Sequence, residues 1–163
     1  MGLGRLGGGV GVVKFLAARG ARIILTDIKP KEELGESLKA LKGFSNIEFV
    51  LGQHRKEDFI DRDFIIKNPG VPQSSPYLRL AKEQGIPIQT DIGLFFQLSK
   101  AGVIGITGTK GKSTTSALTY ELLKKSYTVF LAGNIGKSPL DIIDNTDANS
   151  LVVLELSSWQ LED

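Results

Sequence analysis

Cysteine is absent from the sequence, histidine occurs once, and no long run of apolar residues is present. Without cysteine the chain can form neither disulfides nor thiolate metal sites. His54 has no second ligand-type residue at metal-binding spacing, so we expect it at the surface rather than on a metal. No apolar run approaches the roughly 18 residues of a membrane-spanning helix, and no charged-then-apolar secretion signal stands at the start. We therefore expect a cytoplasmic protein that does not bind membranes.

An excess of charge of one sign is also lacking. The 163 residues include 20 Lys and Arg against 18 Asp and Glu, a formal net charge of +2, and the charges are scattered along the chain. Nucleic acid is not an expected partner, because a binding stripe would need clustered basic residues. The 41% of hydrophobic residues is ordinary for a globular protein, and the length suits one large domain or two small ones. We expect it to act as a monomer.

The most informative stretch is a glycine-rich loop that follows the apolar run 103–106 and precedes a helix beginning near Lys112. The strict phosphate-loop pattern G-x-x-x-x-G-K-[S/T] fails by one residue, because Ile106 stands at its first position. Gly108 supplies the early glycine instead. The alternative is a Gly-Lys helix start that binds nothing, and the strand-like run before the loop and the helical spacing after it disfavour that alternative.

Such a loop binds phosphate because glycines let successive backbone N–H groups turn inward and the helix N-terminus adds partial positive charge. Lys112 would neutralise phosphate oxygens, and the Ser113 hydroxyl would coordinate Mg²⁺. Glu155 ends the apolar run 151–154 and would help to hold that ion, unless it is an ordinary strand-end residue. The candidate ATP-binding residues are Gly108, Thr109, Lys110, Gly111, Lys112, Ser113 and Thr114, with Lys112 and Glu155 as catalytic residues and Ser113 and Glu155 as metal ligands.

The chain opens with a second glycine pattern, G-x-G-x-x-G over residues 2–7. Asp27 follows Gly7 by twenty residues at the end of an expected strand, where a Rossmann domain holds the ribose of NAD. The fingerprint should follow a buried strand, however, and only Met1 precedes it here. The pattern is therefore weak evidence for a dinucleotide, and its glycines could serve only close packing.

Strands and helices alternate along the chain, which predicts an α/β fold of parallel strands joined by helices. The expected strands are 21–27, 47–51, 64–66, 86–88, 103–106, 128–131 and 151–155. The expected helices or helical turns are 10–19, 31–42, 55–60, 76–84, 91–100, 112–125 and 139–143. A domain boundary near Thr90 would separate residues 1–90 from residues 91–163. Asn68-Pro69-Gly70 is a stiff turn that either merely reverses the chain or binds a ligand at a strand end.

The strand that should precede the first glycine loop is central in a doubly wound sheet, between strands 23–26 and 64–66. Its absence predicts a gap at that position, with residues 1–4 at the carboxyl end of the gap and the flanking strands either separated or collapsed together. We expect the chain to be truncated at both ends, and the first unit to be only marginally stable because backbone groups facing the gap would lack partners.

Four segments carry a family resemblance: the loop 107–115, Asn68-Pro69-Gly70, residues 133–136 and residues 154–162. Their order and spacing resemble those of the Mur ligases, the ATP-dependent amide-forming enzymes of peptidoglycan precursor synthesis, and among these the branch that adds D-glutamate. The resemblance implies that residues 1–90 form a Rossmann-like parallel-sheet domain, lacking its first strand, that binds the UDP part of the substrate. It also implies that residues 91–163 form the first part of a P-loop α/β ATPase domain.

The resemblance also implies roles for individual residues. The first loop, the end of the second strand and the Asn-Pro-Gly turn would face the UDP group, Asn134 would contact the muramoyl-alanine part, and Ser157 would lie near substrate and Mg²⁺. The implied substrate-binding residues are Arg5, Leu6, Asp27, Ile28, Lys29, Asn68, Pro69, Gly70, Asn134 and Ser157. The sequence departs from the family pattern at Leu6, Lys110, Gly93 and Trp159, and the first of these blurs the sugar-nucleotide contacts.

The implied reaction uses ATP and Mg²⁺ to join UDP-N-acetylmuramoyl-L-alanine and D-glutamate through an acyl phosphate. We expect this chain alone to be inactive, because later metal-site groups and an amino-acid-binding domain of the family are not in it. Two alternatives stay open. One is an NAD-dependent oxidoreductase, which would leave Lys112 and Ser113 without a purpose, and the other is a nucleotide-binding module without ligase chemistry.

Overall fold

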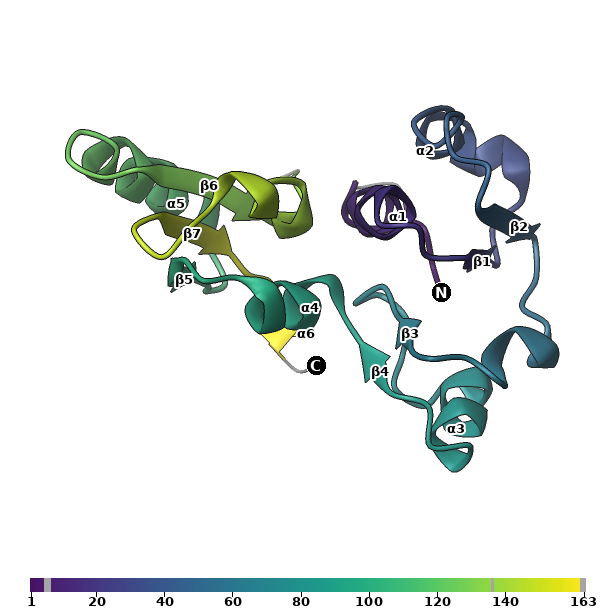
Figure 1. Cartoon of the computed structure of the whole chain (residues 1–163). Coiled ribbons are helices and arrows are strands. Elements are labelled where there is room, and N and C mark those ends of the chain that lie inside the picture. The colour runs from purple at the N-terminus through teal and green to yellow at the C-terminus, as the bar shows by residue number, and fades with distance from the viewer. Residues whose placement is uncertain (5–6, 136, 162–163) are drawn as a thin grey trace.

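The computed structural model describes residues 1–4, 7–135 and 137–161, and it has the expected α/β architecture with parallel strands (Figure 1). Arg5 and Leu6 lie outside the described residues. The elements up to residue 90 are α1 (Gly8–Ala18), β1 (Ile23–Asp27), η1 (Lys31–Leu34), α2 (Gly35–Lys39), β2 (Ile47–Leu51), η2 (Lys56–Phe59), β3 (Ile65–Ile66), α3 (Pro76–Glu83) and β4 (Ile88–Gln89). No helix in the described part of the chain is long and apolar enough to cross a membrane.

The last glycine of the first pattern, Gly7, lies immediately before α1. Gly7 precedes the helix with φ 87°, a backbone conformation that favours glycine. A Cβ on Gly9 would stand 2.1 Å from the carbonyl oxygen of Leu3, so the helix approaches the first loop too closely for any side chain there. Close packing therefore requires glycine at Gly9, which lies two residues beyond the pattern.

β1 and β2 pair in parallel, from Ile23 opposite Ile47 to Asp27 opposite Leu51. One face of α1 covers them through a small core of buried side chains. The members of this core are Leu3, Val13, Leu25 and Leu41.

β3 and β4 form a second parallel pair, packed on α3 and η2. Its core contains Phe59, Ile65 and Leu78. His54, expected at the surface, is half-buried, and its ring packs edge-on against Phe59 and Tyr77. Within the described residues its buried Nδ1 has no hydrogen-bond partner, and burial lowers the pKa of His54 below 6.5.

β1 and β3 do not pair with each other. In the described chain β1 pairs only with β2 and β3 only with β4, so the first ninety residues contain two separate two-stranded sheets. Figure 1 shows the two pairs standing apart on either side of the N-terminus.

The remaining elements build a three-stranded parallel sheet in the order β5-β7-β6. They are α4 (Asp91–Leu98), β5 (Gly102–Ile106), α5 (Lys112–Leu123), β6 (Val129–Gly133), η3 (Pro139–Asp141), η4 (Ile143–Asn145), β7 (Leu151–Glu155) and α6 (Ser158–Leu161). The helix expected at 139–143 is instead two short 3₁₀ turns. α5 packs against the sheet, and Leu118 and Leu122 on that helix are exposed.

The second face of α1 joins the two halves of the chain (Figure 1). Val12 and Phe15 of α1 share a buried core with Phe95 of α4, Leu140 and Val152. A Cβ on Gly11 would come 2.3 Å from the Cβ of Ser138, which shows how tightly α1 packs on this core. The main core of the molecule therefore spans the boundary expected near Thr90.

Candidate functional site

The glycine-rich loop joins the end of β5 at Ile106 to the start of α5 at Lys112. Gly108 has φ 146° and Gly111 has φ 78°, and at both of these positive φ angles a side chain would strain the backbone. Gly111 is the residue immediately before the helix, so the first N–H groups of α5 open onto the loop. The conformation of this loop thus depends on the two glycines that the sequence singled out.

Lys112 lies over the same loop. Its Nζ donates a hydrogen bond to the backbone carbonyl of Gly108 at 2.7 Å. Ser113 and Thr114 follow in the first turn of α5 and are exposed. The Lys112 cation, the hydroxyls of Ser113 and Thr114 and the first N–H groups of a twelve-residue helix therefore lie at this end of β5, a combination suited to a phosphate ester.

Glu155 is the last residue of β7, the central strand, opposite Ile106 of β5 and Gly133 of β6. Its side chain is 2% exposed, and its Oε2 has no hydrogen-bond partner among the described residues. A buried, unpaired carboxylate oxygen is costly unless a cation or donor meets it. This chemistry fits Mg²⁺, which takes oxygen ligands and keeps several waters. The described residues contain no cluster of three or more His, Cys, Asp or Glu side chains around it.

Gly133 and Asn134 reach this strand end from β6. A Cβ on Gly133 would stand 2.2 Å from the carbonyl oxygen of Glu155, and Gly133 has φ 98°. The next residue, Asn134, donates its N–H to that same carbonyl at 2.9 Å. Glycine at 133 therefore lets the chain cross closely over the end of β7 and fixes Asn134 beside Glu155.

A cavity of about 1360 Å³ is lined mostly by residues of the first half of the chain, around β1 and β3, and reaches a few residues of the second half. Five of the substrate-binding residues implied by the sequence resemblance line it: Asn68, Pro69, Gly70, Asn134 and Ser157. The residues of the glycine-rich loop are not among its lining residues. The fold thus gathers the candidate sugar-nucleotide residues of both halves into one space, apart from the candidate ATP loop.

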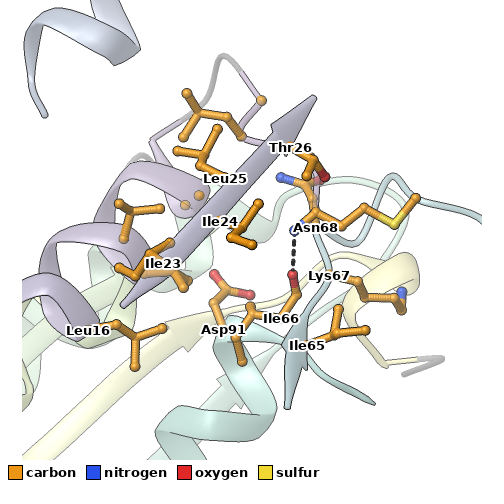
Figure 2. Close-up of a pocket in the computed structure, with 18 of the residues that line it drawn as sticks. Leu16, Ile23, Ile24, Leu25, Thr26, Ile65, Ile66, Lys67, Asn68 and Asp91 are labelled. Carbon is orange, nitrogen blue, oxygen red and sulfur yellow. Dashed lines mark hydrogen bonds between the residues drawn. The ribbon is translucent and has the colours of Figure 1, made fainter. Parts of the chain in front are cut away.

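The Asn68 turn is held in shape by its own side chain. Asn68 Oδ1 accepts the N–H of Gly70 at 3.0 Å, and the Asn68 N–H donates to the Met1 carbonyl at 2.9 Å. On the other side of the cavity, the Ser157 hydroxyl donates to Gln160 Oε1 at 3.0 Å. Figure 2 shows the Asn68 side of the cavity, next to β1.

Asp27 has a different surrounding from the one expected. It is 4% exposed, and its carboxylate accepts the N–H groups of Leu3 at 2.8 Å, Gly4 at 3.3 Å and Lys29 at 2.9 Å. Neither Asp27 nor Ile28 nor Lys29 is among the residues that line the cavity. Asp27 organises the first loop, and the prediction that these three residues face the UDP group stays a prediction. The same prediction for Arg5 and Leu6 falls outside the described residues.

Lys67 and Asp91 are among the cavity residues that the sequence analysis did not single out. Lys67 is 2% exposed, and its Nζ donates to the Val71 carbonyl at 3.5 Å. The position of Lys67 directly after an apolar strand could have indicated a ligand-binding residue, because open α/β sheets bind ligands at strand ends. Asp91 is the first residue of α4, and a carboxylate is common at that position of a helix, so the sequence alone does not mark it as a site residue. Its burial, which raises the pKa of Asp91 above 3.8, depends on packing that the local pattern does not contain.

Comparison with known proteins adds an independent finding. Residues 1–90 match the family model described as Mur ligase MurD-like, N-terminal domain. The chain is 48% identical to the UDP-N-acetylmuramoylalanine--D-glutamate ligase of Borreliella burgdorferi, over 99% of this chain and 36% of the relative. It is 46% identical to the ligase of the same name from Treponema pallidum, over 100% of this chain and 31% of the relative. The chain therefore spans about a third of the length of the curated relatives it matches.

Among solved structures, the chain resembles a pseudomurein peptide ligase type C from Methanothermus fervidus. The TM-score is 0.44 at 19% identity, over 92% of this chain and 30% of the other. A TM-score this low adds nothing to the interpretation of the site.

Proposed function

The chain belongs to the Mur ligase family, through its MurD-like N-terminal domain, and on that premise we propose that it binds the UDP-sugar substrate and the ATP of a D-glutamate-adding ligase. The observation that carries the proposal is that one cavity is lined by Asn68 of the first half and by Asn134 and Ser157 of the second. A nucleotide-sugar needs amide and hydroxyl groups from both sides of such a space, and these residues supply them.

The two halves take different ligands in this proposal. Residues 1–90 are a Rossmann-like unit for the UDP part, with an open strand position between β1 and β3. Residues 91–163 begin a P-loop ATPase unit that holds Mg·ATP through residues 108–114. The substrates of the whole protein are UDP-N-acetylmuramoyl-L-alanine and D-glutamate, and the protein is a cytoplasmic monomer.

ATP supplies the γ-phosphoryl group that converts the substrate carboxylate into an acyl phosphate, which the amine of D-glutamate attacks with loss of phosphate. The residues of this chain bind and neutralise rather than attack. Lys112 exchanges its hydrogen bond to Gly108 for one to phosphate oxygens, and the α5 N-terminus donates N–H groups to the same anion. Ser113 and the unpaired Glu155 Oε2 are the oxygens that would hold Mg²⁺. No covalent enzyme nucleophile is needed.

The structure weighs against the NAD-dependent alternative. That function needs a carboxylate of Asp27 free to accept from ribose hydroxyls. Here both oxygens of the buried carboxylate already accept backbone N–H groups of Leu3, Gly4 and Lys29. Asp27 is therefore engaged in holding its own loop.

Isothermal titration calorimetry with Mg·ATP tests the loop assignment. Lys112→Ala should weaken binding by roughly tenfold or more, because a hydrogen bond to a charged group contributes about 1.5–3 kcal/mol. Lys125→Ala is the matched control, an exposed lysine just beyond the other end of α5, and should bind like the wild type. Equal affinities for the wild type and Lys112→Ala would reject the assignment.

A second titration tests the cavity. UDP-N-acetylmuramoyl-L-alanine, or UDP itself, should bind and should displace any NAD, and Asn134→Ala should weaken the sugar nucleotide more than it weakens UDP. Saturable NAD binding that Asp27→Ala abolishes, with no response to UDP, would reverse the choice of ligand.

A further inference from the structure

Beyond β7 the chain turns tightly around two polar side chains, Ser157 and Gln160, which we call the Ser-Gln pair. Leu156 anchors the start of the turn, because its side chain is buried and its N–H donates to the Ile106 carbonyl of β5 at 2.9 Å. Both members of the pair are half-buried and line the cavity, whereas the two residues between them are exposed. The fold therefore presents the Ser-Gln pair to the proposed ligand.

Hydrogen bonds lock the two side chains of the Ser-Gln pair together. The backbone N–H of Ser157 donates to Gln160 Oε1 at 2.9 Å, and the Ser157 hydroxyl donates to the same oxygen at 3.0 Å. The backbone N–H of Gln160 donates back to Ser157 Oγ at 3.4 Å. These reciprocal bonds are those of a capping box, in which Ser and a Gln three residues later stabilise the start of a helix, here α6.

The backbone decides how each of these side chains is oriented. The N–H of Ser157 can only donate, so the Gln160 amide must turn its oxygen, and not its NH₂ group, toward that N–H. An amide oxygen can only accept, so the Ser157 hydroxyl must give its proton to the same oxygen. The hydroxyl proton is thereby committed within the protein, and Ser157 Oγ has only acceptor capacity left for a ligand.

We propose that Gln160 is a positioning residue that holds the Ser157 hydroxyl as a hydrogen-bond acceptor, so that Ser157 receives an N–H or O–H group of the bound substrate. This inference rests on the proposed function, in which the cavity binds a UDP-sugar. Phosphate and carboxylate oxygens are acceptors, so Ser157 does not bind them in this arrangement. The sugar and the alanine of UDP-N-acetylmuramoyl-L-alanine carry hydroxyl and amide N–H donors beyond the diphosphate, and these are the groups that Ser157 would select.

The position of the Ser-Gln pair favours that part of the substrate over the UDP part. The pair belongs to the second half of the chain, like Asn134, whereas the UDP contacts are proposed for residues of the first half. Without the Gln160 oxygen the Ser157 hydroxyl would rotate, and only some of its orientations would leave a lone pair directed at a substrate donor. The loss of one such neutral hydrogen bond corresponds to a factor of roughly two to ten in affinity.

The single tryptophan supplies a binding signal at the pair. Trp159 lies between Ser157 and Gln160 in the sequence, is 64% exposed and lines the cavity, so its fluorescence should change when a ligand enters. The full 163-residue chain is titrated with UDP-N-acetylmuramoyl-L-alanine and, separately, with UDP. Gln160→Leu should weaken binding of the sugar nucleotide roughly two- to tenfold and leave the affinity for UDP unchanged.

Two variants control for the chemical change itself. Gln160→Glu keeps an oxygen acceptor for both Ser157 donors and should bind the sugar nucleotide within about twofold of the wild type. Gln97→Leu makes the same substitution at an exposed glutamine of α4 that is not among the residues lining the cavity, and it should bind both ligands like the wild type.

A double-mutant cycle separates positioning from general support of the fold. Ser157→Ala should weaken the sugar nucleotide by the same factor as Gln160→Leu, and the double variant should lose no more than either single variant, because all three remove one ligand contact. Additive losses, or a matching loss of UDP affinity, would overturn the positioning role. A loss that appears only with Mg²⁺ present would assign the Ser157 lone pair to a cation and would likewise overturn the proposal.

Amide hydrogen exchange tests the Ser-Gln pair without a ligand. Gln160→Leu should speed exchange of the Ser157 N–H, whereas Gln160→Glu should keep it protected, and the Leu156 N–H, bonded to Ile106, should change little in either variant. Unchanged exchange at Ser157 in Gln160→Leu would overturn the positioning role whatever the chain binds. A wild type that binds neither UDP nor the sugar nucleotide, with exchange as expected, would instead reject the proposed function and with it the ligand contact of Ser157.

Discussion

Asp27→Ala should destabilise the protein substantially. The substitution removes the acceptor for three backbone N–H groups, of which the bond from Leu3, at 2.8 Å, is buried. A hydrogen bond to a charged group contributes about 1.5–3 kcal/mol, and the two partly buried bonds, one of them long at 3.3 Å, add about 0.5–1 kcal/mol each. The expected loss is about 2.5–5 kcal/mol, a large share of the roughly 5–15 kcal/mol that stabilises a typical domain.

Urea unfolding followed by circular dichroism measures this loss. Asp27→Asn should fall between wild type and Asp27→Ala, because its amide keeps one oxygen acceptor for Leu3 and Gly4 but can present a donor to Lys29. Asp63→Ala removes an exposed carboxylate from the same half of the chain and should change the unfolding free energy by less than about 0.5 kcal/mol. An Asp27→Ala protein as stable as Asp63→Ala would refute the view that Asp27 holds the first loop together.

Two further substitutions test the packing and the electrostatics of the cavity. Gly133→Ala should lower the unfolding free energy by about 2 kcal/mol or more, because its Cβ would overlap the Glu155 carbonyl at a positive φ. Gly35→Ala has open space around it and should be neutral or slightly stabilising in the same urea titration. Equal effects of the two substitutions would contradict the close approach at Gly133. Burial raises the pKa of Asp91 above 3.8, so the carboxyl group binds its proton more tightly in the folded protein than in the unfolded chain. This difference stabilises the folded state fully below pH 3.8, and the stabilisation is lost as pH rises through the folded pKa. Asp91→Asn should therefore gain stability relative to wild type between pH 3 and pH 7, and a difference that does not vary with pH would reject this origin.

The sequence by itself determined the order of strands and helices and the position of the glycine-rich loop. These features depend on local causes: apolar runs, glycine at positive φ, and helix starts such as Thr90, whose side chain accepts the N–H of Gly93. Two expected helices differed. Residues 31–42 form a 3₁₀ turn followed by the short helix α2, and the helix expected at 139–143 is replaced by η3, which packs against α1, and η4. The family resemblance likewise followed from short segments whose spacing can be counted.

Only the tertiary structure decided what each candidate residue contacts. Asp27 stood at the correct spacing for a ribose ligand, yet its oxygens accept from the first loop, because that loop folds back over the end of β1. Glu155 is buried because β5 and β6 flank β7 on both sides, and its Oε2 has no hydrogen-bond partner among the described residues. Asn68 and Asn134 line the same cavity because α1 shares a core with the second half of the chain. Contacts between residues far apart in the chain arise from packing, and no local pattern specifies them.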